Sequence, residues 1–284
     1  MKIGVTGATG QFGNIVVEQL KKKVAADSIV ALVRNPQKAN GLGVETHLFD
    51  YDKPEILPDA LKGIDNLLLI SGSEIGQRIR QHANVIGAAK KAGVKWIVYT
   101  SLLHANTSTM SLAGEHSATE AALKESGIAY TLLRNGWYTE NYNGSIQKSL
   151  ATGVFIGCAG DGKISSSARA DYAEAAAIVI ADESHKGKVY ELAADQAYTF
   201  ADMAAEISRQ TGKDIPYKNL PEAEYAAILK NAGLPEAIAM ALAGWDISTS
   251  KGDLFDDSHT LSGLLGRPTT SMAQSVKKAL SATH

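Results

Sequence analysis

The sequence has little of what disulfide-bonded, metal-binding, nucleic-acid-binding or membrane proteins require. It contains a single cysteine, Cys158, which excludes internal disulfides and any multi-cysteine metal site. The formal net charge is only −2, without the basic excess of a nucleic-acid-binding protein. No apolar run reaches the roughly 18–20 residues that span a bilayer, and the first residues read as a strand instead of a secretory signal. We therefore expect a cytoplasmic protein with no metal and no nucleic-acid or membrane partner, whose oligomeric state the sequence leaves open.

Short β-branched segments alternate with helical patterns through the first half of the chain. Two of these segments, residues 67–70 and 96–99, are apolar on both faces, as strands covered by helices on both sides must be. Such alternation is typical of βαβ units, so the predicted fold class is α/β, a Rossmann-type doubly wound parallel sheet with helices on both faces. The expected strands are residues 2–6, 28–33, 44–49, 66–71, 95–101 and 129–134.

The alternation ends near residue 140, which suggests a second domain. Asn, Gly and Ser cluster in residues 139–149 and 159–167, before a predicted helix at 170–182 and a predicted strand at 187–194. A mostly helical segment follows. We expect residues 1–150 to form the sheet domain, which also receives the strand near 187–194, and residues 151–284 to form a smaller, mostly helical lobe.

Three glycines stand between the first strand and the first helix, in the segment TGATGQFG. The first, Gly7, allows a tight turn; the second, Gly10, lets backbone N–H groups approach a diphosphate; the third, Gly13, lets the helix pack closely on the strand. The helix N-terminus then presents its partial positive charge to the phosphates. The segment therefore predicts a dinucleotide site, and residues 1–150 become a dinucleotide-binding Rossmann domain.

The residue after the second strand indicates which dinucleotide is bound. NAD-binding proteins place an acidic residue there to hold the ribose 2′-hydroxyl, whereas this chain has Arg34, followed by Asn35 and Pro36. A guanidinium binds a 2′-phosphate that a carboxylate would repel. We predict NADPH as the cofactor, against the alternative of a solvated arginine. Asp50, at the end of the third strand, either binds the adenine or caps the turn DYDKP.

Several segments together resemble the NmrA-like group of atypical short-chain dehydrogenases/reductases. Within that group the chain is most similar to the bacterial NAD(P)H:quinone oxidoreductases of type 2 and less similar to the triphenylmethane reductases. The glycine motif is shared widely, whereas RNGWYTENY and LLHANTS are more specific. The segments that carry the resemblance are TGATGQFG, ALVRNPQKA, LLLISGSEIGQR, YTSLLHA, YTLLRNGWYTENY, GVFIGCAGDGKI and SKGDLFDDS.

The resemblance implies an NADPH site and a small quinone as hydride acceptor, with residues 151–284 as the substrate-binding lobe. Two of the implied segments are strand ends at the sheet edge where the glycine turn also lies. The cofactor residues are Gly7, Ala8, Thr9, Gly10, Gln11, Phe12, Gly13, Arg34, Asp50, Leu69, Ile70, Ser71, Ser73, Asn135, Gly136, Trp137, Tyr138, Thr139 and Glu140.

The usual proton-donating pair of short-chain dehydrogenases is incomplete. That pair is Tyr-x-x-x-Lys, but here Tyr99 is followed at that spacing by Leu103. By resemblance to the isoflavone-reductase-like enzymes, the position of their lysine is held by His116. His116 either donates a proton or a hydrogen bond to a quinone oxygen, or is a surface histidine bonded to Glu120. The hydroxyls of Tyr99 and Ser101 either face the substrate or pack at the strand end.

A quinone acceptor reduces the need for a strong protein acid. Hydride addition gives a hydroquinone anion, which is far more stable than an alkoxide and takes its proton from water. The protein then mainly holds two rings together and excludes solvent. Trp137, Tyr138 and Tyr142 are the expected substrate residues, against the alternative of plain packing.

Two other functions stay open from the sequence. NmrA-like proteins include redox sensors that bind dinucleotide without turnover, and the missing lysine is compatible with such a sensor. A reductase of another flat conjugated acceptor, such as a dye, is the other alternative.

Overall fold

The computed structural model describes residues 1–281, which form two compact units. The first unit comprises residues 1–106, 112–135 and 170–190. The second comprises residues 107–111, 136–169 and 191–281.

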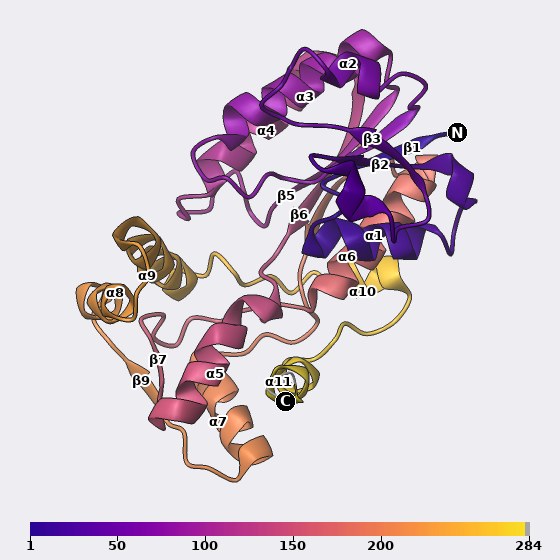
Figure 1. The fold of residues 1–284 in the computed structure, drawn as a ribbon. Helices are drawn as coiled ribbons and strands as arrows, with labels where there is room; N and C mark the ends of the chain where they lie inside the picture. Colours follow the sequence, from indigo (N-terminus) through magenta and orange to yellow (C-terminus); the bar gives the residue numbers. More distant parts are fainter. Residues whose placement is uncertain (282–284) are drawn as a thin grey trace. The chain divides into compact units, whose positions relative to one another are not determined.

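The first unit is built on a seven-stranded sheet of order β3-β2-β1-β4-β5-β6-β8 (Figure 1). β1 lies inside the sheet and pairs in parallel with β2 and β4, so the strand order reverses beside it. The six strands expected before residue 135 are all present, and β8 adds the strand expected near 187–194, which confirms the predicted fold class. The strands are β1 Ile3–Thr6, β2 Ile29–Val33, β3 Glu45–Leu48, β4 Asn66–Leu69, β5 Trp96–Leu102, β6 Ala129–Asn135 and β8 Val189–Leu192.

Helices cover both faces of this sheet. α2 (Leu57–Ala60), α3 (Arg78–Ala92) and α4 (Ala113–Ser126) lie on one face, and α1 (Gln11–Leu20) and α6 (Arg169–Ala181) lie on the other (Figure 1). On the first face the side chains of Leu67, Val85, Ile97 and Leu123 are fully buried in one apolar cluster. Because strands β4 and β5 are covered on both sides, their apolar runs are continuous instead of alternating.

Local sequence signals account for the helix ends. α3 and α4 each stop at a glycine in the left-handed region, Gly93 at φ 78° and Gly127 at φ 75°, as their sequences predict. The segment PEILPDAL (residues 54–61) forms only the single turn of α2. Short 3-10 helices complete the unit: η1 Ala26–Ser28, η2 Pro36–Ala39 and η4 Glu183–His185.

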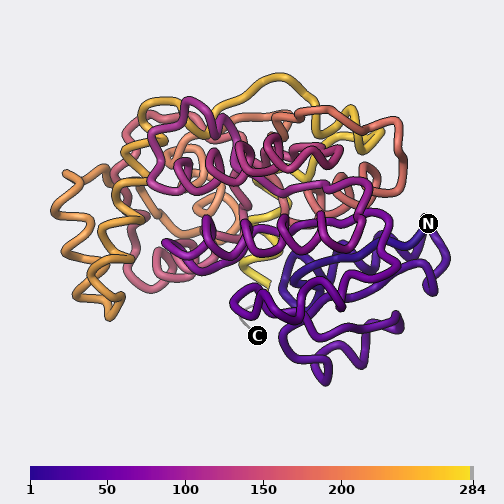
Figure 2. The backbone as a smooth tube through the Cα atoms, turned by 90° about the horizontal axis from the view of Figure 1, so that it is seen from above, coloured from indigo at the N-terminus to yellow at the C-terminus, as the bar shows by residue number. Residues whose placement is uncertain are grey.

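The second unit is mainly helical, with a small parallel pair of strands, β7 and β9. α8 and α9 pack against each other (Figures 1 and 2). α7 begins with a capping box in which Thr199 accepts from the N–H of Asp202. The elements are η3 Thr139–Tyr142, α5 Asn143–Thr152, β7 Phe155–Gly157, α7 Phe200–Thr211, β9 Tyr217–Asn219, α8 Glu222–Asn231, α9 Glu236–Ser250, α10 Thr260–Leu265 and α11 Met272–Ser281.

The division into units differs from the expected boundary at residue 150. Residues 136–169 already belong to the second unit, and residues 170–190 return to the first. The return has a topological reason: most of α6 covers the large sheet, and β8 extends that sheet beside β6, where the N–H of Leu132 donates to the carbonyl of Lys188 (3.0 Å).

Among the residues that the structure describes, no helix combines the length and the apolar character needed to cross a bilayer.

Candidate functional site

The glycine-rich turn joins β1 to α1 in the first unit. Gly7 has φ +59°, a left-handed conformation that glycine adopts without strain. α1 then begins after Gly10, and no side chain caps this helix start. Gly7, Thr9, Gly10 and Gln11 are exposed. An uncapped helix N-terminus behind an exposed turn fits the diphosphate of a dinucleotide.

Gly13 performs the packing role that its place in the motif predicts. A Cβ atom built on Gly13 would lie 2.3 Å from the carbonyl oxygen of Gly7 and 2.8 Å from the Cα of Ala8. Phe12 beside it is buried. The first turn of α1 therefore lies directly on the backbone of the glycine turn, as close as a residue without a side chain permits.

Threonine hydroxyls hold the backbone that follows β4, where Leu69, Ile70, Ser71 and Ser73 are predicted cofactor residues. The N–H of Ile70 donates to Oγ1 of Thr6 (2.9 Å), and the N–H of Ser71 donates to Oγ1 of Thr100 (2.9 Å). The hydroxyl oxygen of Tyr51 lies 2.6 Å from Oγ1 of Thr6 and 2.9 Å from the carbonyl oxygen of Ile70. Polar side chains of β1, of β5 and of the turn after β3 thus fix this segment.

Two side chains of α3 hold Gly72 in the same segment. Its N–H donates to Nε2 of His82 (2.9 Å), and its carbonyl accepts from Nε of Arg78 (2.6 Å). Nδ1 of His82 lies 2.9 Å from the hydroxyl of Thr119, which donates to the carbonyl of Glu115 (2.9 Å). His82 is therefore neutral, with its proton on Nδ1. Burial, followed by the charge of Arg78, lowers the pKa of His82 to about 4.

Arg34 lies on the surface after β2, with 67% of its side chain exposed. Its NH1 contacts Oε1 of Glu74 at 3.0 Å. An exposed ion pair of this kind contributes only about 0–1 kcal/mol to stability, so little is lost when another anion replaces the carboxylate. Asp50 accepts a hydrogen bond from the N–H of Asp52 (3.2 Å), the turn-capping contact that was its alternative to adenine binding.

His116 and Tyr99 form a buried pair in the first unit. Tyr99 is completely buried and His116 is 5% exposed, so His116 is not the surface histidine bonded to Glu120 that was its alternative. The hydroxyl of Tyr99 lies 2.8 Å from Nδ1 of His116. Burial, followed by the charges of Arg78 and His82, lowers the pKa of His116 to about 3. His116 is therefore neutral at physiological pH and offers an N–H, not an imidazolium proton.

Ser101 contacts an ion pair instead of open space. Its hydroxyl donates to Oε1 of Glu120 (2.6 Å). Glu120 accepts two further bonds, from Nε (2.9 Å) and NH2 (2.6 Å) of Arg134 on the adjacent strand β6. The carboxylate and guanidinium are only 11% and 13% exposed, so this is a nearly buried pair with two parallel bonds.

The segment after β6 enters the second unit, where several of the predicted cofactor residues contact other parts of that unit. Asn135, the last residue of β6, is buried and Gly136 follows it. Within the second unit Tyr138 lies against the guanidinium of Arg169 (5.0 Å), and Glu140 accepts from the N–H of Arg169 (2.9 Å). The hydroxyl of Thr139 lies 3.0 Å from that of Ser166.

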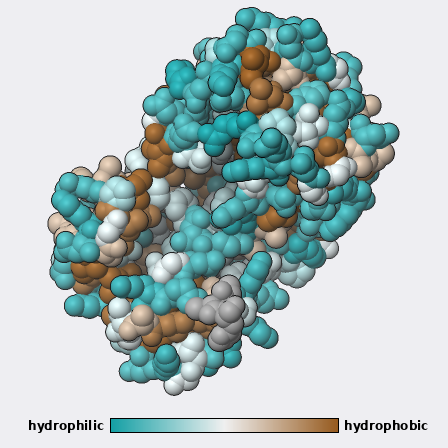
Figure 3. All heavy atoms as spheres, viewed as in Figure 1, coloured by the Kyte–Doolittle hydropathy of each residue, from teal (hydrophilic) through white to brown (hydrophobic). Residues whose placement is uncertain are grey.

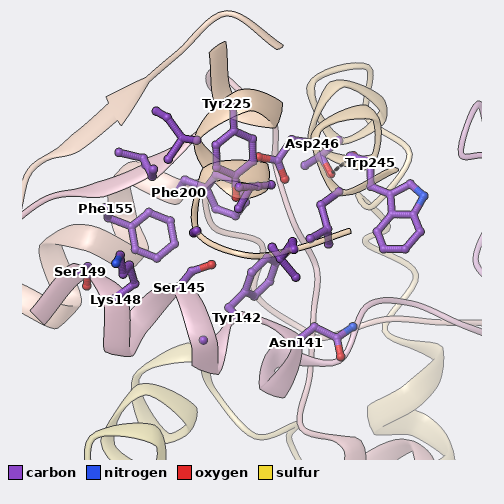
Figure 4. Close-up of a pocket in the computed structure, with 18 of the residues that line it drawn as sticks. Asn141, Tyr142, Ser145, Lys148, Ser149, Phe155, Phe200, Tyr225, Trp245 and Asp246 are labelled. Atoms are coloured by element: carbon purple, nitrogen blue, oxygen red, sulfur yellow. Dashed lines mark hydrogen bonds between the residues drawn. The ribbon is translucent and has the colours of Figure 1, made fainter. Parts of the chain in front are cut away.

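An apolar cavity of about 430 Å³ lies within the second unit and includes two of the three predicted substrate residues, Trp137 and Tyr142. Trp137 meets Trp245 edge to face with ring centroids 5.5 Å apart, and Tyr142 meets Phe200 in the same way at 5.4 Å. Figure 4 shows Tyr142, Phe200 and Trp245 around the cavity. Tyr138 is not among its lining residues.

Asp246 stands in the wall of this otherwise mainly apolar cavity (Figure 4). Its Oδ2 accepts from the N–H of Cys158 (2.9 Å). Burial raises the pKa of this carboxyl to about 6, because desolvation outweighs the hydrogen bond.

The raised pKa of Asp246 means that ionising this carboxyl at neutral pH destabilises the folded protein. The substitution Asp246→Asn removes that cost. Stability contributed by the protonated carboxyl is present below about pH 4 and is lost as pH rises to about 6. We expect Asp246→Asn to increase the free energy of unfolding at pH 7 by about 2–3 kcal/mol and to leave it unchanged near pH 4. Urea unfolding at both pH values measures this; an equal effect at both would contradict it.

No cluster of three or more His, Cys, Asp or Glu side chains suited to a metal ion occurs within residues 1–281.

Sequence reasoning missed the residues that support the site from behind. Thr6, Thr100 and His82 bond the backbone of residues 70–72, yet a threonine at a strand end or a histidine within a helix has many possible roles. The only available signal was position: Thr6 and Thr100 lie at or near the carboxyl ends of strands flanking β4.

Comparison with known proteins agrees with the predicted resemblance. Over 277 residues the chain is 58% identical to quinone oxidoreductase 2 of Escherichia coli strain K12, covering 96% of this chain and 97% of that protein. A crystal structure of an E. coli NADPH-dependent quinone oxidoreductase complexed with NADPH has a TM-score of 0.96 and 57% identity, covering 98% of this chain and 99% of that one.

The similarity extends to a dye reductase. The triphenylmethane reductase of Citrobacter sp., complexed with NADP(H), has a TM-score of 0.94 and 40% identity, covering 98% of this chain and 100% of that one. The model of the NmrA-like family matches residues 1–262. Because this match covers most of the chain, the chain belongs to the NmrA-like family.

Proposed function

We propose that this protein is an NADPH-dependent reductase that transfers a hydride to a quinone in a two-electron reduction. The observation that carries the proposal is the 58% identity, over nearly the whole length of both chains, with an E. coli quinone oxidoreductase. The local geometry supports it, since the turn at Gly7–Gly13 has the conformation and the helix start that a diphosphate requires.

Several parts of the cofactor have candidate partners in this chain. The glycine turn holds the diphosphate and Arg34 holds the 2′-phosphate, whereas we assign Asp50 the capping of its turn because it accepts from the N–H of Asp52. Residues 69–73 of the first unit hold the nicotinamide half. Bound NADPH supplies the hydride, while the chain positions the two rings and keeps water away from them.

Arg34 accounts for the preference for NADPH over NADH. Arg34→Ala is expected to weaken NADPH binding by about 1.5–3 kcal/mol, the worth of a charge-assisted hydrogen bond, and to leave NADH binding nearly unchanged. Isothermal titration calorimetry with both cofactors measures the difference. As a control, Glu74→Gln removes the carboxylate that now contacts Arg34 and should not weaken NADPH binding. An equal loss for both cofactors in Arg34→Ala would refute the assignment.

His116 acts in this proposal as a neutral hydrogen-bond donor. When the hydroxyl of Tyr99 donates to Nδ1, the proton of His116 is on Nε2, where it is available to a quinone oxygen. The hydroquinone anion then takes its proton from water. Tyr99 positions His116, and we assign Ser101 no contact with the acceptor because its hydroxyl donates to Glu120.

His116→Ala is expected to lower kcat/KM for benzoquinone by about 3- to 10-fold, the loss of one hydrogen bond. Because the pKa of His116 is about 3, the wild-type rate should show no histidine-type step between pH 5 and 8. Steady-state kinetics across this range measure both effects. Unchanged turnover in the variant removes His116 from the site, and a step near pH 6.5 removes the neutral-donor assignment.

The test of the function itself is the oxidation of NADPH by benzoquinone, followed at the nicotinamide absorbance and corrected for the uncatalysed reaction. Saturable turnover is the expected result. Tight NADPH binding with no turnover of any acceptor would indicate a redox sensor instead. Turnover of a triphenylmethane dye but not of benzoquinone would indicate a dye reductase.

A further inference from the structure

The cavity of the second unit is larger than a quinone ring requires. Its volume of about 430 Å³ falls within the range of roughly 300–1,000 Å³ that is typical of sites for drug-sized ligands. It is formed by α5, β7, α7, α8 and α9. A single unsubstituted ring occupies only a small part of such a space.

The walls suit an aliphatic or aromatic group. Phe155 and Trp245 lie on opposite sides of the cavity, with Phe200 and Tyr225 between them (Figure 4). Leu229 adds an aliphatic wall from α8. Apolar atoms are also exposed outside, over α8 and α9, where the hydropathy colouring shows brown patches and Met240 is 62% exposed (Figure 3).

Charged groups in the lining are few. Lys148 and Asp246 are the only charged side chains among the residues that line the cavity in the described chain, residues 1–281. Asp246 already accepts a hydrogen bond from the backbone N–H of Cys158. An occupant therefore gains mainly from apolar contact.

The cavity is continuous with the residues predicted to contact the acceptor. Trp137 and Tyr142 both line it, and Trp137 packs on Trp245. A quinone ring beside Trp137 would thus have a substituent-sized space next to it, within the same unit.

We propose that this cavity binds the apolar substituent of the acceptor, so that the preferred substrates are quinones with an alkyl side chain. The inference rests on the proposed quinone reductase function and specifies its substrate class. Burying each methylene group improves apparent affinity by roughly fourfold when burial is complete.

The test compares benzoquinones with methyl, butyl and hexyl substituents at saturating NADPH. We expect kcat/KM to rise at least 10-fold from methyl to hexyl, through a lower KM. Gly144 provides a variant that fills the cavity: it lines the wall in α5, and a Cβ built there meets no atom within 4 Å. Gly144→Leu should reduce the gain to under about threefold and leave unsubstituted benzoquinone turnover unchanged.

Two further variants keep the test independent of folding. Gly87→Leu makes the same change in α3, where a Cβ also meets no atom within 4 Å, and should keep the full gain. Leu229→Ser makes the wall polar at a half-buried position and should lower the gain without filling the cavity.

The outcomes separate this inference from the proposed function. Turnover of benzoquinone with no dependence on chain length, or a full gain in Gly144→Leu, would overturn the substituent site alone. No turnover of any quinone would overturn the proposed function as well.

Discussion

Glu120→Gln is expected to lower the free energy of unfolding by roughly 3–5 kcal/mol. The substitution keeps the shape of the side chain but removes the charge that compensates Arg134, whose guanidinium is only 13% exposed. Removing the charge of one partner from a nearly buried ion pair costs far more than a surface ion pair is worth. Urea unfolding at pH 7 measures the loss.

Two matched controls are the single variant Arg134→Met and the double variant Glu120→Gln/Arg134→Met. The double variant removes both charges, so its loss should be smaller than the sum of the two single losses by about 1.5 kcal/mol or more. Ser101 keeps a hydrogen-bond acceptor in the amide of the glutamine. Single losses below about 1 kcal/mol, or additive losses, would show that the pair contributes no more than a surface pair.

Gly13→Ala is also expected to lower the free energy of unfolding strongly, because it requires the backbone to move. The new Cβ would lie 2.3 Å from the carbonyl oxygen of Gly7, and this atom belongs to the turn itself, not to a flexible side chain. Overpacking usually costs about 1–3 kcal/mol, and we expect a loss at the upper end, about 3 kcal/mol. Displacing α1 from the turn should also weaken NADPH binding at least about 10-fold. Denaturation and calorimetry measure the two effects.

Gly87→Ala is the control for the same change in a helix with open space. A Cβ at Gly87 meets no atom within 4 Å, so the variant should gain about 0.5–1 kcal/mol from helix propensity. If Gly13→Ala were tolerated as well as Gly87→Ala, close packing of α1 on the glycine turn would not be what requires glycine there.

Local rules predicted most of the first unit. The continuous apolar runs of β4 and β5 and the glycine ends of α3 and α4 were readable because each depends on residues adjacent in sequence. The return of residues 170–190 to the large sheet was only partly readable. The strand pattern of β8 was recognisable, but the membership of α6 depends on the surface that the sheet offers to it.

The features of the candidate site also fall into those that local sequence predicts and those that it does not. The conformation of Gly7 and the packing of Gly13 follow from the spacing of glycines beside a strand and a helix. The protonation state of His116 does not follow from such spacing. Its neighbours Tyr99 and His82 come from β5 and α3, and its own burial among distant elements lowers its pKa. Ser101 likewise bonds Glu120 only because β5, α4 and β6 bring three distant residues together.

By itself, the sequence determined the parallel sheet, the glycine turn and the family, because strand patterns, turn conformations and motifs are properties of short segments. Only the tertiary structure decided that His116 is buried and neutral, that Glu120 pairs with Arg134, and that Trp137 and Tyr142 border one apolar cavity. These features depend on desolvation and on contacts between elements distant in sequence, which no local pattern records.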